Sequence, residues 1–225
     1  EVEKWCSEKL SRDPDSIAAN LTMFHLTREA GDLLRSMDYI NKCISQTQQG
    51  SQAWLNFMLT KSNTLITAYT RTENNDYFDS SVDTLEEILD LQPNNVSVLN
   101  NLAYLLADNN QNIEKAVEYG KKAHELNPQN GNTMDTYAFT LIKSGQCKEA
   151  QELLIQAVQI FEMQTEQQVL WEVYKHLGMA NECLEKMSEA LTYYNKAKDS
   201  AMENNAPDIQ IKEIEDKIQK INSLI

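Results

Sequence analysis

The sequence predicts an all-α fold in which about five helix pairs stack into a solenoid, and the main evidence is an internal repeat. Three successive sets of small residues share one pattern, with gaps of 13 and 7, then 12 and 7, then 12 and 7 positions. The sets are Ala103, Ala116, Ala123; Ala138, Ala150, Ala157; and Gly178, Ala190, Ala197. Small side chains at such intervals mark places where two helices approach closely, because a larger side chain would hold them apart. A unit of about 34 residues that recurs in this way is typical of a helical solenoid.

The composition supports helices throughout the chain. The 225 residues include only 6 Gly and 4 Pro, which is too few for the many turns of an all-β fold. Leu, Ala, Glu, Lys and Gln, which favour helix, dominate instead. Residues 1–225 are therefore predicted to form a single solenoid with one continuous core.

The first segment, residues 1–14, is predicted to be the second helix of a repeat. Trp5, Cys6 and Leu10 are expected to face inward. Pro14 ends the helix, because proline disfavours a helical conformation at the residue before it. Since this repeat lacks its first half, the sequence is predicted to be the C-terminal fragment of a longer protein.

The next two repeats are less regular. Residues 16–50 keep the 12 and 7 spacing with less typical residues, namely Phe24, Ser36 and Cys43. Residues 51–93 are predicted to begin with a helix of about 20 residues, because the apolar side chains recur on one helical face over that length. If Ser62 and Ser81 occupy the small positions, about seven residues are inserted between them.

The remaining repeats are assigned to residues 94–129, 130–163 and 164–203. Gly178 lies 40 residues after Ala138, so the chain before Gly178 is predicted to be about five residues longer than usual.

Residues 207–225 are predicted to form a capping helix, in which apolar residues alternate with Glu and Lys. The apolar residues are Ile209, Ile211, Ile214, Ile218, Ile221 and Leu224. A terminal repeat needs such a cap, because its outer side would otherwise expose the stacking surface. The natural C-terminus is therefore expected close to Ile225.

The spacing of small residues resembles that of the tetratricopeptide repeat. The run Leu99–Tyr104 and the run Asp135–Ala138 look most like bacterial members of that family. The resemblance covers nearly the whole chain and is strongest from residue 93 to residue 203. It implies a right-handed superhelix whose concave surface, formed by the first helix of each pair, binds another protein.

The resemblance also selects candidate residues for a peptide groove. They are Asn100, Tyr104, Asp108, Asn132, Asp135, Phe139, Lys143, Lys175, Met179 and Glu182. Tyr104, Phe139 and Met179 are expected to line up as an apolar stripe in the groove. The alternative is that these three side chains are buried between the two helices of each pair. The subclass that binds chaperone tails through a carboxylate clamp is a poor match, because only Asn101 fits and Asp135 would repel a carboxylate.

Catalytic and metal-binding motifs are absent from the sequence. His25, His124 and His176 have no Cys, Ser or carboxylate at a catalytic or metal-ligand spacing, so all three are expected at the surface or in the groove. No glycine-rich phosphate loop is present. The sequence therefore predicts neither enzymatic activity nor a cofactor.

The cysteines predict neither a zinc site nor a disulfide-rich scaffold, because they are widely spaced and form no CxxC motif. They are Cys6, Cys43, Cys147 and Cys183. Cys43 and Cys147 fall at packing positions of their repeats and are expected to be buried thiols. That expectation is compatible with a reducing compartment.

Charge and hydropathy restrict the partners. With 20 basic and 34 acidic residues the formal net charge is -14, so nucleic acids and anionic membrane surfaces should be repelled. The acidity is concentrated between residues 51 and 100, either as ordinary solvated helix faces or as a docking patch for a basic partner. No apolar run reaches the roughly 18 residues of a membrane span.

These observations predict a non-catalytic protein-interaction module, an adaptor or assembly scaffold that binds a peptide or protein in its concave groove. Two alternatives remain open. The chain could be a regulatory or substrate-positioning region of an enzyme whose catalytic domain lies upstream, or it could be a self-association module that forms homo-oligomers. The expected location is the bacterial cytoplasm or the periplasm and cell envelope, and any export signal would precede Glu1.

Overall fold

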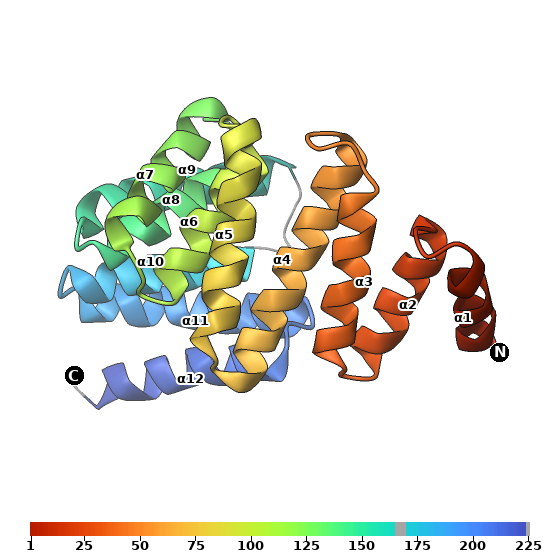
Figure 1. Ribbon diagram of the computed structural model, residues 1–225. Coiled ribbons are helices and arrows are strands. Elements are labelled where there is room, and N and C mark those ends of the chain that lie inside the picture. Colours follow the sequence, from red (N-terminus) through yellow and green to blue (C-terminus); the bar gives the residue numbers. More distant parts are fainter. Residues whose placement is uncertain (165–169, 224–225) are drawn as a thin grey trace. The chain divides into compact units, whose positions relative to one another are not determined.

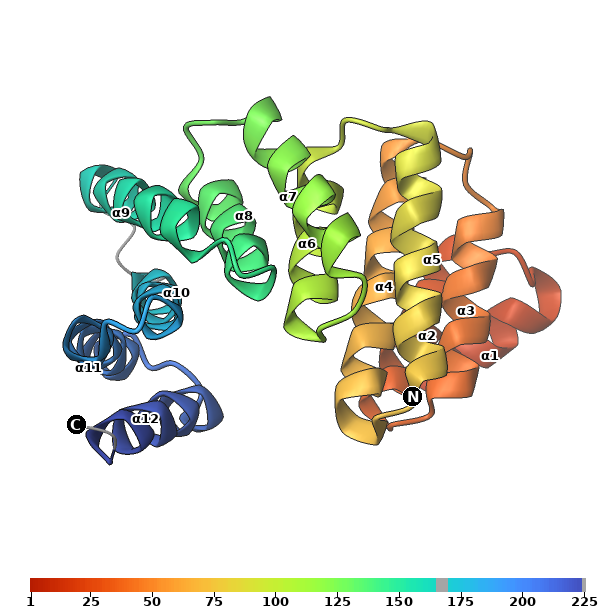
Figure 2. The same ribbon diagram turned by 90° about the vertical axis from the view of Figure 1, so that its left-hand side faces the viewer.

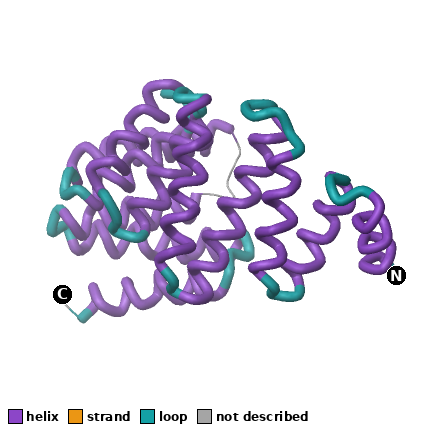
Figure 3. Tube along the Cα trace, viewed as in Figure 1, coloured by secondary structure: helices purple, strands orange, loops and turns teal. Residues whose placement is uncertain are grey.

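The computed structural model describes residues 1–164 and 170–223, which form twelve α-helices and no strand (Figure 3). The prediction of an all-α helical repeat with paired helices is confirmed. The chain divides into two compact units, unit 1 (Glu1–Pro93) and unit 2 (Asn94–Ile225). Each unit is built from helices that pack against their neighbours in the sequence.

Unit 1 contains five helices, coloured from red to yellow in Figure 1. They are α1 (Val2–Arg12), α2 (Ile17–Glu29), α3 (Leu33–Ser45), α4 (Gln52–Thr72) and α5 (Asn75–Leu91). Two pairs, α2 with α3 and α4 with α5, make the most extensive contacts of the unit. The core of the first pair is centred on three fully buried residues, Phe24, Ile40 and Cys43.

The long first helix predicted between residues 51 and 93 is confirmed, since α4 has 21 residues where α2 has 13. Ser62 and Ser81 occupy the small positions where α4 and α5 cross. Both serines are buried, and their hydroxyl oxygens lie 2.9 Å apart in a hydrogen bond. The two hydroxyl groups are hydrogen-bonded to each other inside the core. This pairing explains why two polar residues are tolerated at positions that are usually occupied by alanine.

The inward position predicted for Trp5 is wrong. The Cys6 side chain is fully buried, but the Trp5 side chain is 55% exposed. Successive residues on a helix point about 100° apart, so a narrow contact with one neighbouring helix buries only one of the two. In the described residues α1 packs against α2, and Cys6 faces that contact.

Unit 2 contains the seven remaining helices (Figure 2). They are α6 (Val96–Asp108), α7 (Ile113–Leu126), α8 (Gly131–Lys143), α9 (Cys147–Gln164), α10 (Leu170–Cys183), α11 (Met187–Glu203) and α12 (Asp208–Asn222). The three pairs are α6 with α7, α8 with α9, and α10 with α11. The first helices of these pairs, α6, α8 and α10, also contact one another in that order.

The longer segment predicted before Gly178 is partly accounted for by α9, which has 18 residues against 14 in α7. The rest of that segment, residues 165–169, lies outside the described residues.

All nine small residues of the repeat are buried. Ala123 and Ala157 have no exposed surface, as the spacing predicts. Gly178 shows why a small residue is required, because a Cβ atom built there would lie 2.6 Å from ring carbons of the buried Tyr194. Helices α10 and α11 therefore approach as closely as the absence of a side chain at Gly178 allows.

Helix α12 is held by the carboxylate of Glu182 on α10. Lys217 and Lys220 of α12 donate to that carboxylate at 3.3 and 3.2 Å, and the Tyr194 hydroxyl donates to it at 3.0 Å. Burial alone would raise the pKa of Glu182, but these three partners together lower it. Ile214 and Ile221 of α12 are buried against α11, while Leu224 lies outside the described residues.

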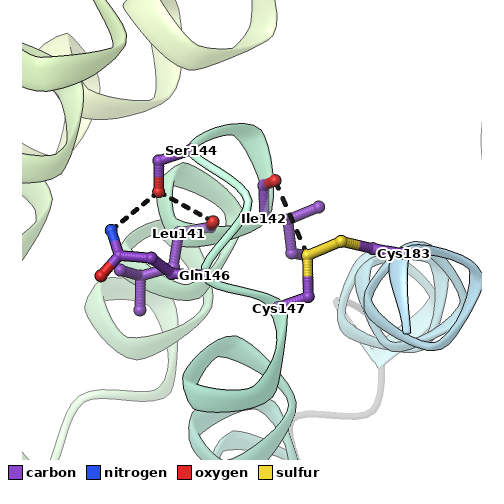
Figure 4. Close-up of a disulfide and its surroundings, with 6 residues drawn as sticks. All are labelled: Leu141, Ile142, Ser144, Gln146, Cys147 and Cys183. Atoms are coloured by element: carbon purple, nitrogen blue, oxygen red, sulfur yellow. Dashed lines mark hydrogen bonds between the residues drawn. A yellow bond between two sulfur atoms is a disulfide. The ribbon is translucent and has the colours of Figure 1, made fainter.

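Cys147 is not the free thiol that its repeat position suggested. It forms a disulfide with Cys183, with a Cα–Cα distance of 6.1 Å (Figure 4). Helices α9 and α10 pack against each other, and the start of α9 lies beside the end of α10. The Sγ atom of Cys147 also lies 4.0 Å from the carbonyl oxygen of Ile142, a contact without a hydrogen bond because a disulfide sulfur carries no hydrogen. Cys6 and Cys43 remain free and buried.

Candidate functional site

Three rings from three helices stack in a row across unit 2. The ring centroids of Tyr104 (α6) and Phe139 (α8) are 5.4 Å apart, and those of Phe139 and His176 (α10) are 4.5 Å apart. We call Tyr104, Phe139 and His176 the ring row, and the surface of α6, α8 and α10 that carries it the A-helix face. The ring row forms because α8 packs against both α6 and α10. Each of these three helices contributes one aromatic or imidazole side chain to the row.

One helical turn before the ring row, each helix presents a polar side chain. These positions are Asn100, Asp135 and Glu172, each four residues before its ring. A hydrogen bond joins Asp135 to His176. The Oδ1 atom of Asp135 lies 2.9 Å from the Nδ1 atom of the His176 imidazole. The Oδ1 atom of Asn100 is buried and has no hydrogen-bond partner among the described residues. We call Asn100, Asp135 and Glu172 the acceptor row.

The electrostatic field at Tyr104 comes mainly from carboxylates. Burial is the first cause that raises the pKa of the Tyr104 phenol, and four carboxylates add to it. These are Asp108, Glu172, Asp135 and Glu213. The pKa of Glu172 is itself raised, first by burial and then by Asp135, although His176 and Lys175 act in the opposite direction. Carboxylates thus act on the Tyr104 phenol, and Lys175 and Lys217 lie close enough to act on Lys143 nearby.

The lysines around the A-helix face are already engaged. Lys175 lies 3.7 Å from Glu213 of α12 and 5.7 Å from the Trp171 ring centroid. Lys143 donates to Asn110 at 3.0 Å and lies 5.2 Å from the Phe139 ring centroid. Lys175 also acts electrostatically on the carboxylate of Glu172, and the carboxylate of Asp108 acts on the ammonium group of Lys143.

The ten predicted groove residues differ widely in exposure. Tyr104 is 36% exposed, and Asp108 and Asn132 are also exposed. The half-buried residues are Asn100, Lys143, Lys175, Met179 and Glu182. Phe139 and Asp135 are buried, with 3% and 7% of their surface exposed. These two therefore lie beneath the A-helix face and support it.

Tyr104, Phe139 and Met179 do not form one exposed stripe. Tyr104 and Phe139 are in contact, but Met179 packs toward the cluster formed by Trp171, Tyr194 and residues of α12. The neighbour of Phe139 on α10 is instead His176, three residues before Met179. The alternative prediction, that Phe139 is buried between the two helices of its own pair, does not hold either. Both rings that contact Phe139 lie on the first helices of the neighbouring pairs.

Glu172 and His176 were missed as site residues. All three histidines were expected at the surface or in the groove, but His176 is buried with 1% of its surface exposed, while His25 is exposed and His124 is half-buried. A Glu and a His four residues apart share one helical face, and this spacing was the available signal. Because the segment before Gly178 is longer than in the other repeats, the repeat spacing could not predict that this face of α10 lies against Phe139.

The carboxylate of Glu172 is expected to reduce the stability of the folded chain at neutral pH. Its folded pKa is raised above the unfolded value of 4.5, so the unfolded chain loses this proton more readily. The protonated Glu172 side chain makes its full contribution to the free energy of unfolding below the unfolded pKa. This contribution is lost as the pH rises through the folded pKa. Glu172→Gln should therefore raise the melting temperature at pH 7 and have little effect at pH 4. An unchanged melting temperature at pH 7 would contradict this expectation, and exposed Asp108→Asn is the control.

The described residues contain no group of three or more His, Cys, Asp or Glu side chains placed to hold a metal ion. Within the same residues, no helix is both long enough and apolar enough to cross a membrane.

Solved structures with the same fold are found across repeat proteins. YrrB, described as a TPR protein with an unusual peptide-binding site, is 15% identical with a TM-score of 0.57 over 87% of this chain and 91% of its own. BtubC from P. vanneervenii is 15% identical with a TM-score of 0.65 over 91% of this chain and 89% of its own. A thermophilic TPR protein of Thermus thermophilus is 13% identical with a TM-score of 0.60 over 91% of this chain and 100% of its own.

At the level of sequence, residues 84–118 match the family model of the tetratricopeptide repeat. No curated protein matches the chain significantly. The matched segment includes α6 and the first residues of α7, the pair in which the 13 and 7 spacing of small residues begins. Residues 84–118 are therefore similar in sequence to a tetratricopeptide repeat, and the paired helices of the whole chain share the fold of solved tetratricopeptide-repeat proteins.

Proposed function

We propose that this chain is a protein-interaction module whose A-helix face in unit 2 binds a peptide segment of another protein. The observation that supports this function best is the position of Tyr104. Its ring is exposed on one side and rests on the buried Phe139 on the other, so it offers a large contact surface at little conformational cost. Exposed aromatic side chains held rigidly in this way are typical anchors of protein interfaces.

The polar side chains around Tyr104 suit an extended peptide. Asp108 on α6 and Asn132 on α8 are exposed, and Asn100 lies one turn from Tyr104 on the same helix. Amide and carboxylate side chains at these places can hydrogen-bond to a peptide backbone. The fold similarity to YrrB, which is described as having a peptide-binding site, is consistent with this use of the face.

Replacement of Tyr104 tests the proposal. A random peptide library displayed on phage is selected on the wild-type chain, and each binder is measured again on Tyr104→Ala. Loss of one aromatic anchor commonly costs about 2 kcal/mol, which corresponds to roughly 30-fold weaker binding. We expect such a loss by fluorescence anisotropy, with an unchanged helical circular-dichroism signal.

A matched control is Ile155→Ala, because Ile155 is a similarly exposed apolar residue (43%) on α9, the second helix of its pair. It should not affect binding. Phe139→Ala is not a suitable binding variant, because truncation of this buried ring should lower the free energy of unfolding by about 3–5 kcal/mol. Peptides that bind Tyr104→Ala and the wild-type chain with equal affinity would show that the A-helix face is not the binding surface.

We also propose that the chain acts in an oxidising compartment. The support is the Cys147–Cys183 disulfide, because structural disulfides persist mainly in such environments. Protein isolated from its native cells with thiols blocked at lysis should carry this disulfide. Recovery of the fully reduced form would contradict the proposal.

A further inference from the structure

Asp135 and His176 lie beneath the A-helix face, where a bound peptide would have almost no contact with them, because only 7% and 1% of their surface is exposed. Resting on the function proposed above, we infer that both are positioning residues of the peptide site. The hydrogen bond between them fixes the imidazole ring of His176. That ring supports Phe139, and Phe139 holds Tyr104 in the orientation that the peptide meets. The site then extends from one exposed anchor to a chain of contacts across α6, α8 and α10.

The His176 imidazole is attached to α8 at two points that are one helical turn apart. Its Nδ1 atom lies 2.9 Å from Oδ1 of Asp135. Its ring centroid lies 4.5 Å from that of Phe139, with 18° between the two ring planes. Asp135 and Phe139 are four residues apart and therefore lie on the same side of α8. A ring that is held in both ways cannot slide along Phe139 or tilt without losing one of the two contacts.

The hydrogen bond supplies a directional restraint that the ring stack lacks. Aromatic rings attract each other over a range of offsets and tilts, whereas a hydrogen bond weakens steeply when it is bent. A carboxylate only accepts hydrogen bonds, so the Nδ1 atom of His176 carries the hydrogen that points at Asp135. Because both groups are buried, breaking this bond would leave a carboxylate and an N–H group unpaired, which makes other orientations of the imidazole unfavourable.

Phe139 transmits this restraint to the exposed ring of Tyr104. The Phe139 side chain is buried, and its ring contacts His176 on α10 and Tyr104 on α6, with centroids 4.5 and 5.4 Å away. The ammonium group of Lys143 lies 5.2 Å from the same centroid. Tyr104 is the one member of the ring row that a peptide can contact over a large area. A side chain that is already held in its bound orientation loses less entropy on binding, so this support should raise the affinity for the peptide.

The experiment uses the selected peptides that lose affinity on Tyr104→Ala, because these peptides occupy the proposed site. Asp135→Leu removes the acceptor of the hydrogen bond and should weaken their binding about fivefold, which corresponds to the cost of immobilising one side chain. Asp135→Asn keeps a carbonyl oxygen as acceptor on a side chain of the same size and should bind them like wild type. Rescue by the conservative variant is expected only if the hydrogen bond itself matters.

A double variant separates affinity from stability, because Asp135→Leu alone leaves the N–H group of His176 unpaired. Asp135→Leu/His176→Phe removes both polar groups and keeps a ring that can stack on Phe139. Its melting temperature should match or exceed that of wild type, since apolar replacement of a whole buried pair is often neutral or stabilising. Its peptide affinity should nevertheless stay about fivefold weaker. Ser62→Ala/Ser81→Ala replaces the buried hydroxyl pair of unit 1 in the same manner and is the matched control, with unchanged affinity.

A spectroscopic measurement follows the Tyr104 ring without any peptide. In wild type the ring current of Phe139 should move the ring-proton resonances of Tyr104 away from their values in the unfolded chain. This NMR shift should shrink in Asp135→Leu/His176→Phe and persist in Asp135→Asn.

The outcomes separate the positioning role from the proposed function. Full peptide affinity in the double variant, or equal losses in Asp135→Asn and Asp135→Leu, would overturn the positioning role and leave the peptide-binding function standing. An unchanged Tyr104 shift in the double variant would overturn it as well. If no selected peptide depends on Tyr104, the proposed function is wrong, and the Tyr104 shift still decides whether Asp135 and His176 position that ring.

Discussion

Ala157→Arg should lower the free energy of unfolding by about 3 kcal/mol or more, because it overpacks a helix crossing and buries an unpaired charge. Ala157 has no exposed surface and belongs to the core cluster that joins α8, α9 and α10. The melting temperature of unit 2 should fall by on the order of 10 °C. Circular dichroism at 222 nm during a thermal ramp measures this effect.

The neighbouring variant Gln156→Arg is the control for Ala157→Arg. Gln156 is exposed on the same helix, so an arginine there should change the melting temperature little. Equal melting temperatures for the two variants would show that the repeat register, and with it the assignment of the small positions, is wrong.

Removal of the Cys147–Cys183 disulfide should have a comparable effect. The bond joins residues 36 positions apart, and the chain-entropy relation for a loop of that length gives about 4 kcal/mol of stabilisation. Cys183→Ser is the preferred variant, because the Cys183 side is exposed and little packing is lost with the sulfur. Chemical denaturation should show a lower midpoint for this variant than for wild type.

A reductant distinguishes loss of the bond from other effects of the substitution. Dithiothreitol should lower the midpoint of wild type to that of Cys183→Ser and leave the variant unchanged. Alkylation in denaturant without reductant should label only Cys6 and Cys43, whereas prior reduction should make all four cysteines reactive. In the native state burial raises the pKa of Cys43 to about 11, so its thiol should not react at neutral pH. Labelling of four thiols without reduction would show that the disulfide is absent.

The sequence alone determined the helix pairing. Ala123, Ala157 and Gly178 identify the crossings because a close helix approach excludes larger side chains, a constraint that leaves a trace at every repeat. The same logic identified Ser62 and Ser81 across an insertion of irregular length. It also identified Tyr104 as an exposed candidate for binding, since a residue next to a small crossing position points away from the pair.

Only the tertiary structure decided which side chains meet between repeats. The sequence register pairs Phe139 with Met179, but the packing of α8 against α10 brings His176 to Phe139 and Asp135 to His176. The disulfide arises in the same way, from the end of α10 lying beside the start of α9. Periodicity describes the faces of one helix, whereas the stagger between neighbouring helices depends on the sum of their side-chain contacts and on the length of the connection between them. That stagger places the Phe139 ring between those of Tyr104 and His176, and it therefore determines which side chains support the proposed site.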